Sequence, residues 1–170
     1  MSFVFLVGMP GVGKTYWGKE LSTALSIKFL DLDNFIEFRQ KATIPELFAS
    51  LGEDAFRELE HEALMDAISY DESDLIIACG GGTPCFYGNM ELMKSIGTVL
   101  YLQASIYRLL DNLSVSYPRP LLENKETATK LQELMDSRNP VYEQADLIIN
   151  VEGISNLHFE KILELCIKKH

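Results

Sequence analysis

Residues Gly8 to Thr15 carry the clearest chemical signature in this chain. They read Gly-Met-Pro-Gly-Val-Gly-Lys-Thr, which matches the phosphate-binding pattern G-x-x-x-x-G-K-T. Glycines let successive backbone N–H groups surround an anion, and a following helix adds the partial positive charge of its N-terminus. The Lys14 side chain can reach the β- and γ-phosphates, and the Thr15 hydroxyl can bind Mg²⁺ directly. The motif therefore predicts a nucleoside triphosphate site whose contacts come from Gly11, Val12, Gly13, Lys14, Thr15 and Tyr16.

Two carboxylates, Asp31 and Asp33, follow the apolar run Ile27–Leu30. Ligands of open α/β sheets collect beyond the carboxyl ends of the strands, where the phosphate loop is also expected. Along an extended strand end, alternation points both side chains the same way. We expect Asp31 to hold Mg²⁺ through a water molecule and Asp33 to orient a substrate hydroxyl and accept its proton. The alternative is that one Asp only caps a helix over residues 34–40.

Arg57 lies in a predicted helix, Glu53–Ser69, three residues before Glu60. This spacing puts the two charges on one helix face, with Glu53 one turn earlier. One interpretation is a solvated helical salt bridge, which contributes little to stability. The other is that the glutamate holds Arg57 so that its planar fork can bind a substrate carboxylate.

Three consecutive glycines, Gly80, Gly81 and Gly82, follow the apolar run Leu75–Ala78. A strand-to-helix turn needs one or two glycines, so the third favours a binding surface where a ligand approaches the backbone. Arg119 lies in a segment with two prolines that is typical of a lid over a phosphate site, and we place this lid at about residues 113–123. From there Arg119 can contact the transferring phosphoryl group.

The elements that must position these residues alternate between strands and helices. Continuously apolar runs, typical of buried parallel strands, occur at Phe3–Val7, Ile27–Leu30, Leu75–Ala78, Thr98–Leu102 and Leu147–Val151. Helical periodicity separates them, with a capping box at Thr43–Glu46, a helix near Ser105–Leu113, a turn-rich stretch at Ser114–Pro120 and a further helix from about Lys125. The pattern predicts an α/β fold in three layers, α/β/α, with a five-stranded parallel sheet.

Length and composition fit a single domain over residues 1–170. The net charge is −10 and no cluster of Lys and Arg is present, which argues against a nucleic-acid partner. No apolar run is long enough to cross a bilayer, and no leader peptide is recognisable, so we expect a cytoplasmic protein without a membrane partner. Three cysteines, Cys79, Cys85 and Cys166, lack metal-ligand spacing and are expected to be reduced thiols.

Taken in order, these motifs resemble the shikimate kinase family from Phe3 to the C-terminal helix. The resemblance rests on the phosphate loop, Asp31-Leu-Asp33, Gly52-Glu-x-x-Phe-Arg-x-x-Glu60, the triple glycine, Arg119-Pro-Leu-Leu122 and Arg138-x-x-x-Tyr142. Two features depart from the family. Cys79 replaces the usual small hydroxyl residue before the glycines, and the usual adenine-contacting loop is hard to recognise in Val151–Asn156.

The resemblance implies a P-loop NTPase fold of the nucleoside-monophosphate-kinase type, acting as a monomer with ATP and Mg²⁺. The implied reaction transfers a phosphoryl group from ATP to the 3-hydroxyl of shikimate, giving shikimate 3-phosphate and ADP on the pathway to chorismate and aromatic amino acids. The family would assign catalysis to Lys14, Asp33 and Arg119. It would assign shikimate binding to Asp33, Arg57, Gly80, Gly81, Gly82 and Arg138, within a substrate-binding helical segment at about residues 33–60. Phe48 and Phe56 would form the aromatic wall of that pocket.

Two other functions are compatible with a phosphate loop. A sugar-acid kinase of the gluconate kinase type would share the loop, but would not need Arg57, the triple glycine and Arg138 as a set. A catalytically silent nucleotide-binding module could keep Lys14 while losing the substrate residues, whereas Asp33 and the arginines are all present.

Overall fold

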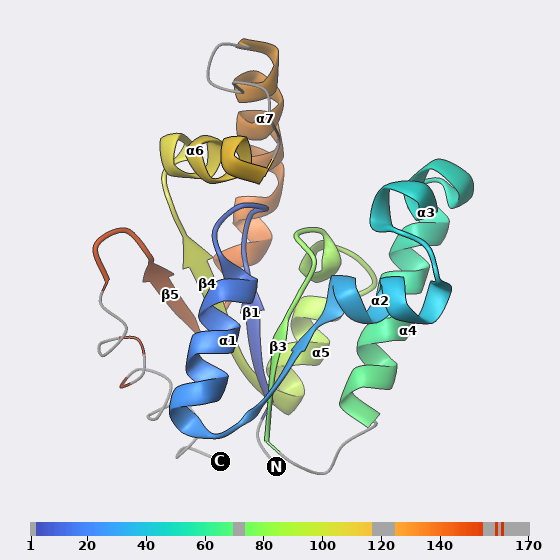
Figure 1. Cartoon of the computed structure of the whole chain (residues 1–170), viewed down its shortest axis with the longest axis vertical. Coiled ribbons are helices and arrows are strands. Elements are labelled where there is room, and N and C mark those ends of the chain that lie inside the picture. Colours follow the sequence, from blue (N-terminus) through green and yellow to red (C-terminus); the bar gives the residue numbers. More distant parts are fainter. Residues whose placement is uncertain (1–2, 70–73, 117–124, 155–158, 160, 162–170) are drawn as a thin grey trace.

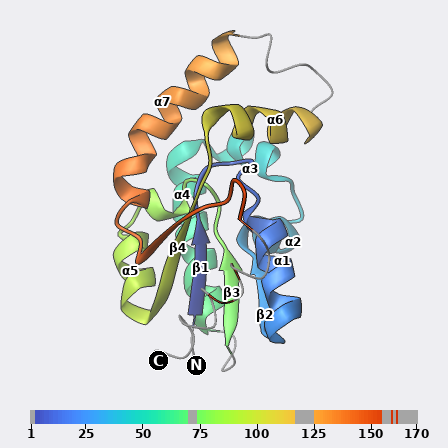
Figure 2. The same cartoon turned by 90° about the vertical axis from the view of Figure 1, so that its left-hand side faces the viewer.

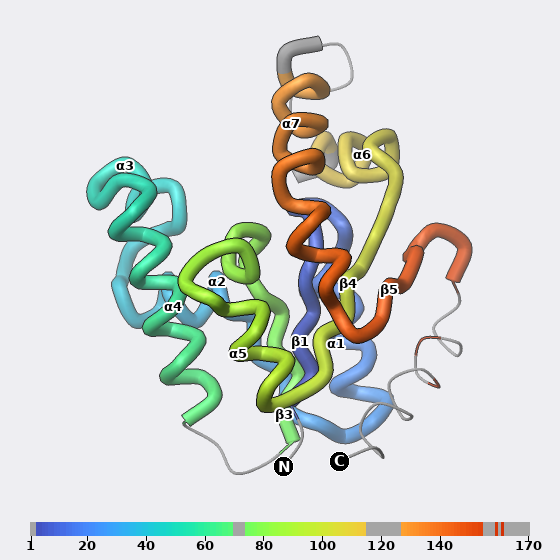
Figure 3. The backbone as a smooth tube through the Cα atoms, turned by 180° about the vertical axis from the view of Figure 1, so that it is seen from behind, coloured from blue at the N-terminus to red at the C-terminus, as the bar shows by residue number. Residues whose placement is uncertain are grey.

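A computed structural model describes residues 3–69, 74–116, 125–154, 159 and 161. Five parallel strands form one sheet in the order β2-β3-β1-β4-β5. The strands are β1 (Phe3–Val7), β2 (Lys28–Asp31), β3 (Leu75–Ala78), β4 (Gly97–Gln103) and β5 (Leu147–Asn150). Helix α1 (Lys14–Leu25) covers one face of the sheet and α5 (Asn89–Ile96) covers the other (Figures 1 and 3). The predicted three-layer fold is confirmed.

The core lies along the three inner strands. Every residue of β1 and β3 is buried, because helices cover both faces of these strands. The edge strand β5 differs from the prediction of a fully buried strand, since Leu147 and Ile148 are exposed. An edge strand has a neighbour on only one side, so an apolar sequence alone does not ensure burial.

Two groups of helices begin beyond the carboxyl ends of the strands (Figure 1). One group follows β2 and comprises α2 (Leu32–Gln40), α3 (Ile44–Leu51) and α4 (Glu53–Ser69). The capping box predicted at the start of α3 is present. The other group comprises α6 (Ile106–Ser116) and α7 (Lys125–Tyr142), which lie to one side of α3 in Figure 1 and across the top of the molecule in Figure 2. The phosphate loop lies between the two groups.

Helix α6 continues to Ser116, so the turn predicted to begin at Ser114 was wrong for residues 114–116. The first proline of that stretch is Pro118, which restricts the backbone of the residue before it but not of residues 114–116. Residues 117–124, including Arg119 and most of the predicted lid, lie outside the described residues. Cys166 lies outside them as well. No helix in the described part of the chain is long and apolar enough to span a membrane.

Candidate active site

The phosphate loop connects β1 to α1 and folds around the Lys14 side chain. Gly8, Gly11 and Gly13 all have positive φ angles, as the motif requires. At Gly8 a Cβ atom would also overlap the carbonyl of Leu102 on β4, so only glycine fits. Lys14 Nζ donates to the carbonyls of Gly8 at 2.8 Å and Met9 at 3.1 Å. Burial lowers the pKa of Lys14 to about 8, although the nearby charge of Asp33 opposes this.

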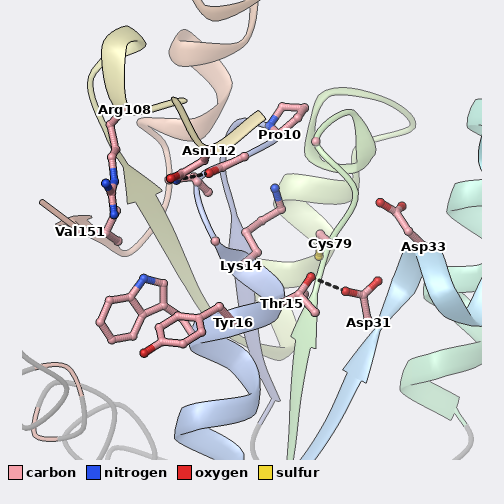
Figure 4. Close-up of a pocket in the computed structure, with 16 residues that line it drawn as sticks. Pro10, Lys14, Thr15, Tyr16, Asp31, Asp33, Cys79, Arg108, Asn112 and Val151 are labelled. Atoms are coloured by element: carbon pink, nitrogen blue, oxygen red, sulfur yellow. Dashed lines mark hydrogen bonds between the residues drawn. The ribbon is translucent and has the colours of Figure 1, made fainter. Parts of the chain in front are cut away.

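Asp31 and Thr15 meet at the base of the pocket, as Figure 4 shows. The Thr15 hydroxyl donates to Asp31 Oδ2 at 2.6 Å. Asp31 Oδ1 accepts a hydrogen bond from the Asn34 backbone at 3.2 Å, so this residue also caps α2. A hydroxyl beside a carboxylate offers the oxygen ligands that Mg²⁺ prefers when phosphates complete its coordination. These residues fit a magnesium ion, and the described residues contain no cluster of three or more His, Cys, Asp or Glu that would form a separate metal centre.

Asp33 lines the pocket from the first turn of a helix, whereas the sequence predicted it at the end of a strand. Strand β2 ends at Asp31, so Asp33 lies in the first turn of α2 and strand alternation does not align the two carboxylates. Both nevertheless line the same pocket, because the chain bends between them (Figure 4). Burial, followed by the charge of Asp31, raises the pKa of Asp33 to about 6, while Lys14 acts in the opposite direction.

Arg57 is buried on α4 and held from several sides. Its Nη1 donates to Glu60 Oε2 at 2.5 Å, and its Nη2 donates to Glu53 Oε1 at 3.1 Å. Arg57 is 6% exposed and Glu60 is 2% exposed, so the interpretation as a solvated salt bridge was wrong. The helix face that carries them packs inward, which sequence spacing alone does not reveal. Of the buried side-chain nitrogens and oxygens that the structure describes, only Arg57 Nε lacks a hydrogen-bond partner.

Three phenylalanine rings surround the Arg57 guanidinium. Their centroids lie 5.2 Å (Phe48), 5.6 Å (Phe56) and 4.7 Å (Phe86) from the Arg57 Cζ atom. An aromatic face attracts a cation and excludes water from it. Phe48 and Phe56 were candidates from the sequence, whereas Phe86 was not, since it lies 29 residues further along the chain.

Side chains from both groups of helices approach the triple glycine. A Cβ atom on Gly80 would lie 2.7 Å from Asp33 Oδ1, and one on Gly81 would lie 3.0 Å from Arg138 Nη1. A Cβ atom on Gly82 would overlap the guanidinium of Arg57. The Tyr142 hydroxyl donates to the Gly81 carbonyl and ties the turn to α7. The absence of side chains at this turn therefore lets Asp33, Arg57 and Arg138 approach one surface.

The pocket beside this turn has a volume of about 750 Å³. It extends from Asp33 and Gly81, past the phosphate loop, to residues that the sequence analysis did not assign to the site: Trp17, Arg108, Asn112 and Val151. Arg108 and Asn112 share one face of α6, four residues apart, and this spacing was the available signal. Arg57 and Arg138 contact the glycine turn but are not among the lining residues of the pocket.

Cys79 directly follows β3 and lines the pocket, although it is buried, with its Sγ 3.6 Å from Met93 Sδ. Burial raises the pKa of its thiol, so the neutral form dominates at physiological pH.

Comparison with known proteins gives one consistent result. A family model described as shikimate kinase matches residues 10–168. Shikimate kinases from Parabacteroides distasonis and Thermus thermophilus are 39% and 34% identical to the chain, over 89% and 99% of its length and 89% of their own.

Solved structures agree with the sequence relatives. A shikimate kinase from Bacteroides thetaiotaomicron has a TM-score of 0.86 at 32% identity, with 98% of each chain covered. One from Acinetobacter baumannii, in complex with shikimate, has a TM-score of 0.86 at 33% identity, covering 99% of this chain and 94% of its own. A gluconokinase from Sinorhizobium meliloti, at 12% identity and a TM-score of 0.65, shares the fold alone.

The parallel sheet, the phosphate loop and the acidic residues beside it define a P-loop kinase. Within that class, the chain belongs to the shikimate kinase family.

Proposed function

We propose that this protein transfers the γ-phosphoryl group of ATP to the 3-hydroxyl of shikimate, giving shikimate 3-phosphate and ADP. The observation that carries the proposal is the glycine turn, where a carboxylate poised for proton transfer and two arginines meet beside a phosphate loop. The product would enter the pathway to chorismate and aromatic amino acids, and the enzyme would act in the cytoplasm as a monomer.

On the nucleotide side, the backbone N–H groups of Gly11, Val12 and Gly13 surround the phosphates, and Tyr16 flanks them. Lys14 exchanges its carbonyl partners for the β- and γ-phosphates, whose negative charge favours its protonated form. Thr15 would hold Mg²⁺ directly and Asp31 would hold it through water. When bound, the metal neutralises charge on the phosphate oxygens.

On the acceptor side, Asp33 binds the 3-hydroxyl. As the hydroxyl oxygen forms its bond to the γ-phosphorus, the bond from that phosphorus to the bridging oxygen of ADP breaks. The hydroxyl proton passes to the Asp33 carboxylate. A base with a pKa near 6 is ionised at neutral pH and still accepts a proton effectively.

The substrate carboxylate binds to Arg57 and Arg138, with the backbone of Gly80, Gly81 and Gly82 against the ring. Arg57 suits this role because it is desolvated, fixed by two glutamates and left with a buried N–H that has no protein partner. Arg119 lies outside the described residues, and its contact with the transferring phosphoryl group stays a prediction from the sequence.

The test is a coupled assay of ADP release with MgATP and either shikimate or gluconate, together with product identification by mass spectrometry. We expect turnover with shikimate only. Turnover with gluconate alone would indicate the sugar-acid kinase, and release with neither acceptor would favour a silent nucleotide-binding module.

A further inference from the structure

Thr83 lies directly after the triple glycine, at the start of the 3-10 turn η1 (Thr83–Cys85). It is fully buried, although its side chain is polar. Its hydroxyl donates to Glu60 Oε1 at 2.8 Å, and its backbone N–H donates to the Gly80 carbonyl at 3.2 Å. One residue therefore links the glycine turn to a buried carboxylate on α4.

The two carboxylate oxygens of Glu60 accept hydrogen bonds from different residues. Glu60 Oε1 accepts from Thr83, and Glu60 Oε2 accepts from Arg57 Nη1. A carboxylate group held at only one oxygen can rotate about its terminal torsion, which has a broad energy minimum. With both oxygens occupied, Glu60 has a fixed plane, and Arg57 has a fixed acceptor.

We propose that Thr83 is a positioning residue for the substrate carboxylate and acts through Glu60 on the orientation of Arg57. This inference rests on the proposed role of Arg57 in binding shikimate. Thr83 does not touch the substrate in this account, because its hydroxyl is directed at Glu60.

A second set of contacts fixes Thr83 itself. The Asn89 side chain donates to the Thr83 carbonyl at 2.8 Å, and its Oδ1 lies 2.7 Å from His61 Nδ1 on α4. Asn89 is fully buried at the start of α5. The turn is thus braced against α4 and α5, and it also supplies Phe86 to the face of the Arg57 guanidinium. These contacts form one connected polar network, in which a bond lost at one point disturbs its neighbours.

The experiment compares Thr83→Val, which removes the hydroxyl with little change of shape, with Thr83→Ser, which retains it. Steady-state KM and kcat are measured for shikimate and for ATP, with melting temperature as a check on folding. We expect Thr83→Val to raise the shikimate KM about tenfold, the scale of a lost hydrogen bond to a charged group, with the ATP KM unchanged. Thr83→Ser should restore the wild-type value.

Thr23→Val is the matched control, because it removes a hydroxyl that donates to Lys19 O on the exposed side of α1. It should leave both KM values unchanged. Should Thr83→Val fail to fold, Thr83→Ala removes the same hydroxyl and leaves space for a water molecule.

Two results would overturn the proposal. One is a hydroxyl-free variant at position 83 with the wild-type shikimate KM. The other is a variant in which the KM values for both substrates rise together with a fall in melting temperature, and which Ser does not rescue. A wild-type enzyme that does not phosphorylate shikimate would instead overturn the proposed function, so the two failures are distinguishable.

Discussion

The surroundings of Asp33 disfavour its ionised form. Burial comes first among the causes of its raised pKa and the neighbouring Asp31 second, while Lys14 partly compensates. A phosphate group drawn into the pocket would pair with Lys14 and reduce that compensation. Mg²⁺ bound beside Asp31 would act in the opposite direction, because a nearby cation favours the ionised carboxylate.

Replacement of Asp33 by Asn should lower kcat by about 100-fold or more, since the amide cannot accept the hydroxyl proton. In the wild-type enzyme, kcat/KM for shikimate should fall as the pH drops below about 6, because Asp33 becomes protonated. This acid limb should be absent from the residual activity of Asp33→Asn. Rates measured across pH 5–8 for both proteins test the loss of kcat and the acid limb. ADP binding measured by calorimetry is the control, since Asp33→Asn should leave nucleotide binding largely intact. Near-normal turnover in the variant would leave Asp33 without a catalytic role.

The two arginines proposed to bind the substrate carboxylate should respond differently to the same substitution. Arg57→Lys should raise the shikimate KM at least tenfold, because an ammonium cannot reproduce the planar fork. It should also lower the free energy of unfolding by about 1–3 kcal/mol, since Arg57 and its partner Glu60 are both buried. Arg138→Lys should raise the KM with a smaller loss of stability, because Arg138 is only half-buried. Denaturant unfolding and kinetics on both variants provide the comparison. An unchanged KM in Arg57→Lys would assign Arg57 to structure alone.

At the scale of elements, α6 is fastened directly to the phosphate loop. Asn112 Nδ2 donates to the Gly11 carbonyl at 2.7 Å. Leu113 and the Leu109 carbonyl lie against the same glycine, close enough that a Cβ atom there would touch both. The helix that leads into residues 117–124 therefore sets the position of the loop that binds the phosphates.

Asn112→Ala should accordingly raise the ATP KM several-fold and leave the shikimate KM unchanged, because one hydrogen bond to a neutral carbonyl contributes about 1 kcal/mol. Tyr107→Ala is the control on the same helix, since Tyr107 is 77% exposed. Equal ATP KM values in the two variants would show that α6 does not act on the loop through Asn112.

The sequence predicted the elements better than it predicted their surroundings. Strand Phe3–Val7 and helix Glu53–Ser69 appear with the expected bounds, because local periodicity and apolar content determine them. The burial of Arg57, by contrast, depends on how α4 packs against η1, and Phe86 approaches it from a distant part of the chain. The helical position of Asp33 was missed because strand and helix meet there without a connecting turn.

At the scale of the whole molecule, three cationic side chains lie near the candidate site of an acidic chain. The chain has a net charge of −10, yet Arg57 and Arg138 lie against the glycine turn and Lys14 lines the same pocket as Gly81. The phosphate loop belongs to β1 and α1, whereas Asp33 and Arg57 belong to the helices after β2. Two ligands can therefore bind to different elements of one folded domain.

This division predicts that MgADP and shikimate stabilise the protein separately. Each ligand, at about 100 times its Kd, should add about 2.7 kcal/mol of stability, or roughly 5–10 °C in melting temperature for a domain of this size. Lys14→Met should abolish the shift from MgADP and preserve the shift from shikimate, because the hydrogen bonds of Lys14 Nζ go to the phosphate-loop carbonyls of Gly8 and Met9. Lys19→Met, an equal change of charge on the exposed side of α1, should preserve both shifts.

Thermal unfolding of the three proteins with each ligand tests this division. A full MgADP shift in Lys14→Met would remove Lys14 from phosphate binding, and loss of the shikimate shift in the same variant would show that the two binding regions are not separable.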